Sequence, residues 1–393
     1  LLHPHPFKMA AFGAILCVSI LVIVVAALFD QVSLFQRENL HDFAFAAALS
    51  FLGFLVTFYF VPIVKEIMLR NDMWGYDINK NGRENNIRIP ESLGIVCGVS
   101  FILCAILLQP FFHHMLGSYN AALLSICFIL LLGFIDDVLD LRWSVKIALS
   151  FVGTLPLLVE YSGPTLIIVP KPLVPLLGNS LALGFLYHLY LLLLVVFCTN
   201  SINIYAGING LETSQTVVIA LSVIAHNYIE ISGPCSQEHM NSLYLMLPFL
   251  GCVLALAYYN AYPADVFIGD SFTYFAGMAL AVAAIQGHFS KTLMLFFIPQ
   301  LINFFLSIPQ LIGIMHCPRH RLPVYNKETK LLEYSRNLTL INATLFITGP
   351  MSEKNLNRLL TAFHILCCVI GFAIRYSHTV THAFYESSHM LSC

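Results

Sequence analysis

The sequence predicts an all-α membrane protein that crosses the bilayer many times, and three observations lead to this fold class. Hydrophobic residues make up 58% of the 393 residues and charged residues only 10%, whereas a soluble domain usually carries about 25% charged residues. The mean hydropathy is +0.80. Apolar runs near bilayer length recur as far as residue 376, and a backbone in lipid satisfies its own hydrogen bonds by forming helices.

About ten transmembrane helices are predicted after residue 42, within a single multi-helix domain that covers residues 43–376. An extra N-terminal apolar helix precedes them at residues 9–29. It lies in a segment, residues 1–42, that could supply an anchor, a further span or a signal sequence. Residues 377–393 form a C-terminal tail. The ten predicted spans are residues 43–64, 92–112, 119–135, 145–161, 183–198, 213–231, 241–258, 272–287, 290–314 and 357–376.

One inter-helix segment differs in composition from the other loops. The stretch VPKPLVPLLGNS, residues 169–180, contains three prolines, which exclude a regular helix. We therefore expect a small extended hairpin near residues 165–182, at one face of the membrane.

The 11 cysteines lie mostly inside apolar runs, their number is odd, and no Cys-x-x-Cys pair is present. This distribution favours free cysteines that act as small apolar side chains. Cys235 is in a polar loop, so a disulfide bond at that position stays open.

Lysine and arginine are distributed unevenly over the two sides of the predicted membrane. With Lys8 set aside, the second side receives only Arg37, Lys171, Lys291 and Arg375, and the first side receives the other fourteen. The positive-inside rule therefore predicts that the first side faces the cytosol. Its loops are residues 65–91, 136–146, 198–213, 259–271 and 315–356. The glycosylation sequons at Asn337 and Asn342 fall on this side, so we expect neither to carry a glycan.

Five polar clusters at helix ends all lie in these cytosolic loops. Each has an ordinary structural explanation: the Asp136-Asp137 pair could be a solvated helix end, and Asp270 could cap the next helix. Asn200 and Asn203 could join two helices. Five such clusters on one membrane face instead indicate a shared site, because ionisable groups at a membrane are costly. The clusters are NIRIPESLG, GFIDDVLDLRWSVK, CTNSINIYAGINGLE, YNAYPADVFIGDSF and CPRHRLP.

The residue types in these clusters suit a phosphorylated ligand. Asn and Asp oxygens are ligands for magnesium, which bridges to substrate phosphates. Lys146 and the Arg319-His320-Arg321 cluster can neutralise phosphate oxygens. The turn from Gly207 to Gly210 lets backbone N–H groups approach a ligand. Since no Walker-type loop or Rossmann fingerprint is present, these clusters predict phosphoryl transfer at a membrane face without ATP or NAD.

The same motifs resemble those of the polyprenyl-phosphate sugar-1-phosphate transferase superfamily, glycosyltransferase family 4. They occur in the family's order over about residues 45–376, and AGING is similar to the eukaryotic branch. The matching elements are DINK (77–80), IPES (89–92), GFIDDVLDLRW with Lys146, FCTNSINIYAGINGLE (197–212), VFIGD (266–270) and CPRHR (317–321).

The resemblance implies transfer of GlcNAc-1-phosphate from UDP-GlcNAc to dolichyl phosphate, giving GlcNAc-diphospho-dolichol and UMP. This would be the first step of lipid-linked oligosaccharide synthesis for protein N-glycosylation. The resemblance also implies Mg2+ as cofactor, sensitivity to tunicamycin, and a homodimer in the endoplasmic reticulum membrane with its active site facing the cytosol. Nucleic acid is not an expected partner. Two alternatives stay open: transfer from another UDP-amino sugar, and a lipid or anion transporter.

The resemblance carries roles to individual positions. Asn203 and Asp270 match the magnesium ligands, and Lys146 matches the lysine that contacts the lipid phosphate. Asp136 and Asp137 match an acidic pair counted with the catalytic residues, and a covalent route through either stays open. The stretch beside the lipid phosphate is Val196, Phe197, Cys198, Thr199, Asn200, Ser201, Ile202, Asn203 and Ile204. The positions that hold the UDP-sugar are Tyr76, Asp77, Ile78, Glu91, Asn209, Arg319, His320 and Arg321.

A direct attack by dolichyl phosphate on the β-phosphorus of UDP-GlcNAc is the expected reaction. A phosphate monoester is largely dianionic at neutral pH, so placement and charge neutralisation matter more than a strong base. Asn209 is expected to hydrogen-bond uracil through its amide donor and acceptor together.

Overall fold

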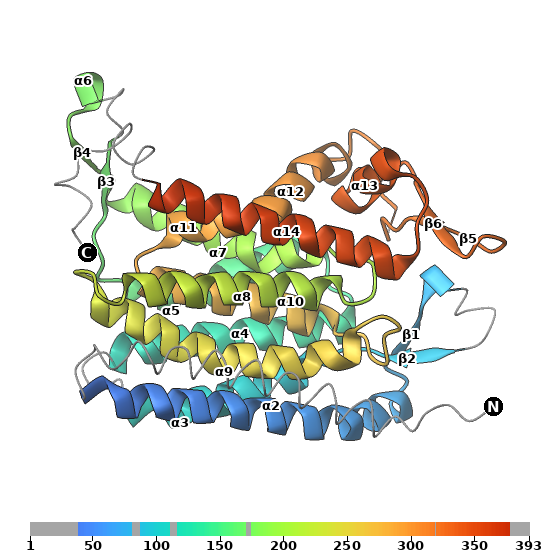
Figure 1. Ribbon diagram of the computed structural model, residues 1–393, viewed down its shortest axis with the longest axis horizontal. Coiled ribbons are helices and arrows are strands. Elements are labelled where there is room, and N and C mark those ends of the chain that lie inside the picture. The colour runs from blue at the N-terminus through green and yellow to red at the C-terminus, as the bar shows by residue number, and fades with distance from the viewer. Residues whose placement is uncertain (1–37, 81–86, 111–115, 170–173, 319, 378–393) are drawn as a thin grey trace.

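The computed structural model describes residues 38–80, 87–110, 116–169, 174–318 and 320–377, which are mostly helical. Figure 1 shows the long helices lying side by side, with small strands at both ends of the bundle. The helices are α2 (Glu38–Arg70), η1 (Ile78–Lys80), α3 (Gly94–Leu108), α4 (Leu116–Leu139), α5 (Trp143–Val159), α6 (Val174–Leu177), α7 (Phe185–Ile204), α8 (Leu211–Glu230), α9 (Ser236–Asn260), α10 (Gly269–Gln286), α11 (Ser290–Phe296), α12 (Ile298–Leu311), α13 (Leu340–Thr348) and α14 (Glu353–Tyr376). The strands are β1 (Trp74–Tyr76), β2 (Arg88–Pro90), β3 (Leu166–Ile168), β4 (Ser180–Ala182), β5 (Val324–Asn326) and β6 (Leu331–Glu333).

Helices form in all ten of the spans predicted after residue 42. By length and apolar composition, five helices of the described ranges could cross a membrane: α2, α4, α7, α9 and α14. The bent pair α11–α12 would make a sixth, and α3 and α5 are apolar but shorter. The predicted helical fold with several helices long and apolar enough to span a membrane is therefore confirmed, while the predicted count of about ten spans stays a prediction. The predicted N-terminal helix at residues 9–29 lies outside the described residues.

Two helices, not one, occupy the predicted span at residues 290–314, and a single span formed by this bent pair stays a prediction. Helices α11 and α12 are bent by 73° at a short break. Phe297 lies between them, and a proline occupies the first turn of α12. Proline favours the first helical positions because it lacks an N–H to donate, so the sequence at Pro299 begins a new helix here.

Three antiparallel hairpins accompany the helices. Strands β3 and β4 pair within residues 166–182, which confirms the predicted extended hairpin. The expectation that the prolines exclude a helix is wrong at one point, because the four-residue helix α6 lies between the two strands and contains Pro175. Two further hairpins, β1–β2 and β5–β6, form inside segments expected to be loops. Figure 1 shows β3–β4 at one end of the bundle and the other two hairpins at the opposite end.

Helix α10 lies at the centre of the bundle, packed against α3, α4, α7 and α9, and every residue from Ser271 to Ile285 is buried. At Gly277 a Cβ atom would overlap the backbone carbonyl of Cys198 in α7. Small residues of this kind let two helix backbones approach closely. The approach of α7 to α10 also brings the end of α7, at Asn203, to the start of α10, at Asp270.

The cysteine prediction is confirmed for most of the described chain. Eight described cysteines are free, six of them buried. Cys235, where the sequence left a disulfide bond open, is disulfide-bonded.

Candidate active site at the ends of α4, α7 and α10

A cavity of about 240 Å³ opens where α7 ends and α10 begins, beside the β1–β2 hairpin. Its wall brings together residues from four of the five polar clusters. Six of the eight positions predicted to hold the nucleotide sugar line it, together with both predicted magnesium ligands. These residues are Tyr76, Asp77, Ile78, Glu91, Asn209, His320, Asn203 and Asp270.

Arg321, one of the two arginines predicted to hold the nucleotide sugar, does not line the cavity. Arg321 is partly buried, and its Nη2 donates a hydrogen bond to the backbone oxygen of Ile204 at 3.3 Å. Burial lowers the pKa of this guanidinium from its usual value. Arg321 therefore braces the end of α7 beside the cavity, and Arg319 lies outside the described residues.

The predicted metal ligands are in direct contact. Asn203 Nδ2 donates a hydrogen bond to Asp270 Oδ1 at 2.6 Å. The other oxygen of Asp270 lies 3.8 Å from the ammonium group of Lys146. Burial raises the pKa of Asp270 well above its ordinary value; the hydrogen bond to Asp136 and the charges of Asp137 and Asp136 add to this, while Lys146 opposes them.

Asp136 positions Lys146. Its Oδ2 lies 2.7 Å from Lys146 Nζ, and Tyr274 donates a hydroxyl hydrogen bond to the same oxygen at 3.3 Å. The backbone N–H of Leu141 donates to Oδ1 at 3.0 Å. Both oxygens of this buried carboxylate are therefore occupied by groups of the protein.

Asp137 caps the N-terminus of α10. Its Oδ1 accepts a hydrogen bond from the backbone N–H of Asp270 at 2.6 Å, and its Oδ2 accepts one from Ser271 at 3.1 Å. A carboxylate satisfies the unpaired N–H groups of a helix start and interacts favourably with the helix dipole. Gly133, one turn earlier in α4, makes this approach possible, because a Cβ atom there would overlap the backbone of Asp270. Asp137 thus fixes the position of Asp270.

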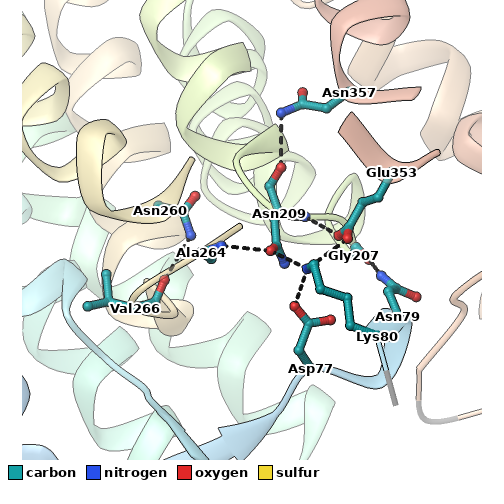
Figure 2. Close-up of polar contacts among 10 residues, drawn as sticks. All are labelled: Asp77, Asn79, Lys80, Gly207, Asn209, Asn260, Ala264, Val266, Glu353 and Asn357. Carbon is teal, nitrogen blue, oxygen red and sulfur yellow. Dashed lines mark hydrogen bonds and ion pairs between the residues drawn. The ribbon is translucent and has the colours of Figure 1, made fainter. Parts of the chain in front are cut away.

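A second polar group surrounds Asn209, as Figure 2 shows. The backbone N–H of Asn209 donates to Glu353 Oε1 at 2.7 Å, and its backbone oxygen accepts a hydrogen bond from Asn357 at 2.9 Å. Its side-chain Oδ1 accepts hydrogen bonds from Lys80 Nζ at 2.6 Å and from the backbone N–H of Ala264 at 2.9 Å. The expectation that Asn209 offers both amide groups to uracil is therefore wrong, because Oδ1 is already occupied.

Sequence reasoning missed three members of this group: Lys80, Glu353 and Asn357. Lys80 ends the DINK motif but received no role, and it forms ion pairs with Asp77 and, at 2.8 Å, with Glu353. Glu353 is buried in the first turn of α14. The only signal at the sequence level was an acidic residue after Ser352, which is typical of a helix start.

The stretch predicted to lie beside the lipid phosphate, residues 196–204, forms the end of α7. Its residues do not share one surface. Cys198, Ser201 and Ile202 are buried, and Phe197, Asn203 and Ile204 are partly exposed. Asn200 donates a hydrogen bond to Val196 within the same helix at 2.8 Å. Only part of this stretch is therefore accessible to a ligand.

Comparison with known proteins identifies the family of the chain. Residues 119–288 match the model of glycosyl transferase family 4. A UDP-N-acetylglucosamine–dolichyl-phosphate N-acetylglucosaminephosphotransferase of Dictyostelium discoideum is 49% identical, over 84% of this chain and 88% of the relative. The chain belongs to glycosyl transferase family 4. Two more members of the family with the same name come from Schizosaccharomyces pombe and Saccharomyces cerevisiae. The first relative is 37% identical, over 84% of this chain and 90% of the relative. The second is 33% identical, over 82% of this chain and 89% of the relative.

Proposed function

We propose that this family member transfers GlcNAc-1-phosphate from UDP-GlcNAc to dolichyl phosphate, with GlcNAc-diphospho-dolichol and UMP as products. The observation that carries the proposal is the meeting of Lys146, Asp270 and Asn203 beside a cavity of about 240 Å³ at the helix ends. An amide and a carboxylate at the cavity wall, with a cationic group 3.8 Å from that carboxylate, suit two phosphorylated substrates. The names of the relatives support the same reaction.

The residues present fit a magnesium ion. The side chains of Asn203 and Asp270 touch one another at the cavity wall and offer amide and carboxylate oxygens. Within the described ranges, no group of three or more His, Cys, Asp or Glu residues gathers to form a protein cage. Magnesium usually takes one or two carboxylates and completes its shell with waters and substrate phosphates. When bound, the ion would neutralise the charge of the diphosphate.

Lys146 is the residue that would receive the lipid phosphate. Its ammonium group is held by Asp136 at 2.7 Å and lies 3.8 Å from Asp270. The second pKa of a phosphate monoester is about 6, so the dolichyl phosphate oxygen is already a nucleophile at neutral pH. It would form a bond to the β-phosphorus while the bond from that phosphorus to the bridging oxygen of UMP breaks. The protein would supply alignment and positive charge, not a base.

We place the enzyme in the endoplasmic reticulum membrane with this site facing the cytosol. The excess of lysine and arginine in the loops around the site supports that orientation. Cys235 is disulfide-bonded and follows α8, whose 20 residues lead about 30 Å away from the site. Disulfide bonds form in oxidising compartments such as the endoplasmic reticulum lumen. Assembly as a homodimer stays a prediction from the family resemblance.

The test is UMP release by detergent-purified protein that receives UDP-GlcNAc and dolichyl phosphate, with and without magnesium. We expect release that needs both the lipid and magnesium and that tunicamycin blocks. Asp270→Ala should abolish it. Asp265→Ala is the matched control, because Asp265 lies in the same segment, is 66% exposed and pairs only weakly with Lys65 at 4.0 Å. If UMP is released only from another UDP-amino sugar, that sugar nucleotide is the substrate. If UMP is released from none of them, the transporter alternative is left.

A further inference from the structure

The side-chain amide of Asn209 is held by two groups that can only donate hydrogen bonds. The ammonium group of Lys80 and the backbone N–H of Ala264 point at the same amide atom, at 2.6 and 2.9 Å. Neither an ammonium group nor a backbone N–H can accept a hydrogen bond. The amide atom between these two donors must therefore be the oxygen.

The other end of the amide is consequently fixed as a donor. Asn209 lines the cavity, and within the described residues no hydrogen bond from its Nδ2 to another residue is found. Turning the amide over would place an N–H2 group against the ammonium of Lys80 and the N–H of Ala264. That arrangement would lose two hydrogen bonds, one of them charge-assisted, and set donors against donors.

Lys80 is itself held away from the ligand. Its Nζ pairs with Asp77 and Glu353, and Glu353 in turn accepts the backbone N–H of Asn209 at 2.7 Å. Lys80, Glu353 and Asn209 thus form a closed ring of interactions, visible in Figure 2. The cavity wall includes residues 76–79, but Lys80 is not part of it. This lysine acts on Asn209 and not on a bound ligand.

We propose that Lys80 is a positioning residue that sets base specificity, by forcing Asn209 to present a hydrogen-bond donor to the cavity. The inference rests on the proposed function, in which the ligand is a uridine nucleotide. Uracil has a carbonyl acceptor at position 4, and cytosine has an amino donor at the same position. A fixed donor at Asn209 therefore favours uracil and opposes cytosine. Without Lys80 the amide can turn over and accept a hydrogen bond instead.

The experiment compares kcat/KM for UDP-GlcNAc and CDP-GlcNAc, measured by release of the nucleoside monophosphate in detergent with dolichyl phosphate. In Lys80→Met we expect the preference for UDP over CDP to fall by about tenfold or more, which corresponds to one charge-assisted hydrogen bond. The kcat for UDP-GlcNAc should change less than this ratio. Lys80→Arg keeps a charged donor and should keep the preference.

Two further variants serve as a control and as a substitute in case Lys80→Met does not fold. Lys65→Met is the matched control, because it removes a partly exposed lysine from the end of α2, where its partner is Asp265. Lys80→Met could fail to fold because Glu353 loses its counter-charge. In that case the double variant Lys80→Met with Glu353→Gln is used in place of the single variant. A folded variant of either kind that keeps the full preference for UDP overturns the inference. Wild-type protein that turns over no UDP-GlcNAc overturns the proposed function instead, and the inference with it.

Discussion

Replacing Asp137 with asparagine tests whether this carboxylate positions the site or takes part in the chemistry. Both oxygens accept backbone N–H groups at the start of α10, at 2.6 and 3.1 Å. Asparagine keeps one acceptor and turns an N–H2 toward the other N–H. The change removes one charge-assisted hydrogen bond, about 1.5–3 kcal/mol, and the attraction of the carboxylate for the helix N-terminus, about 0.3–1 kcal/mol. We expect the free energy of unfolding to fall by about 2–4 kcal/mol.

Activity should fall for a related reason. Asp270 and Ser271 are the residues that Asp137 holds, so the start of α10 would shift relative to Lys146. A misplacement of about 1 Å can cost about 100-fold in rate. We therefore expect Asp137→Asn to melt at a lower temperature and to release UMP slowly but measurably.

The two readouts together can refute this reasoning. Thermal unfolding and UMP release are measured on the same preparation, with Asp140→Asn as the control because Asp140 is exposed at the end of the same helix. A variant with the wild-type melting temperature and no UMP release at all would mean that Asp137 acts in the chemistry.

Two further predictions concern pH and glycosylation. Burial raises the pKa of Glu212, in the first turn of α8, from 4.5 to about 7, so the folded protein holds this proton more tightly than the unfolded chain. The stability that Glu212 contributes is complete below pH 4.5 and is lost as the pH rises through about 7. We therefore measure the free energy of unfolding of the wild type and of Glu212→Gln at several pH values and take the difference between them. This difference should fall by up to about 3 kcal/mol as the pH rises over that range. A difference that does not change with pH would contradict the prediction. Asn342 is fully buried and accepts hydrogen bonds from Ser335, so glycosidase should leave the mass unchanged and Asn342→Gln should lower the melting temperature. A mass loss on glycosidase treatment that Asn342→Gln abolishes would show that this side chain is exposed to glycosylation.

The helices could be predicted from the sequence because their signal is local. An apolar run such as the one in α9 carries its own evidence for a helix, and the prolines of residues 169–180 mark the β3–β4 hairpin. Strands β1, β2, β5 and β6 have three residues each, which is too short for an alternating pattern to be recognised. The bend between α11 and α12 was missed because apolar composition continues across it.

Only the site residues that lie within short sequence motifs could be predicted. Asn203, Asp270 and Lys146 stand in motifs with several polar residues, so each was singled out before its neighbours were known. The partners of Asn209 are different, since Lys80 is 129 residues away and Glu353 is 144 residues away along the chain. The DINK motif marks Lys80 without indicating its partners, and nothing local distinguishes Glu353 from an ordinary helix-start glutamate. Only the packing of η1 and α14 around the loop after α7 gives them a role.

The contacts of the acidic pair also bear on the covalent alternative left open by the sequence. Asp136 accepts hydrogen bonds from Leu141 and Tyr274 and an ion pair from Lys146, and neither it nor Asp137 lines the cavity. To attack phosphorus, either carboxylate would have to give up charge-assisted contacts and leave their donors unpaired, which costs free energy at each buried group. Direct transfer between two bound phosphates requires no such loss. The same carboxylates, kept in place, hold Lys146 and Asp270 ready before the substrates arrive, and preorganised charge of this kind is what stabilises a phosphoryl-transfer transition state.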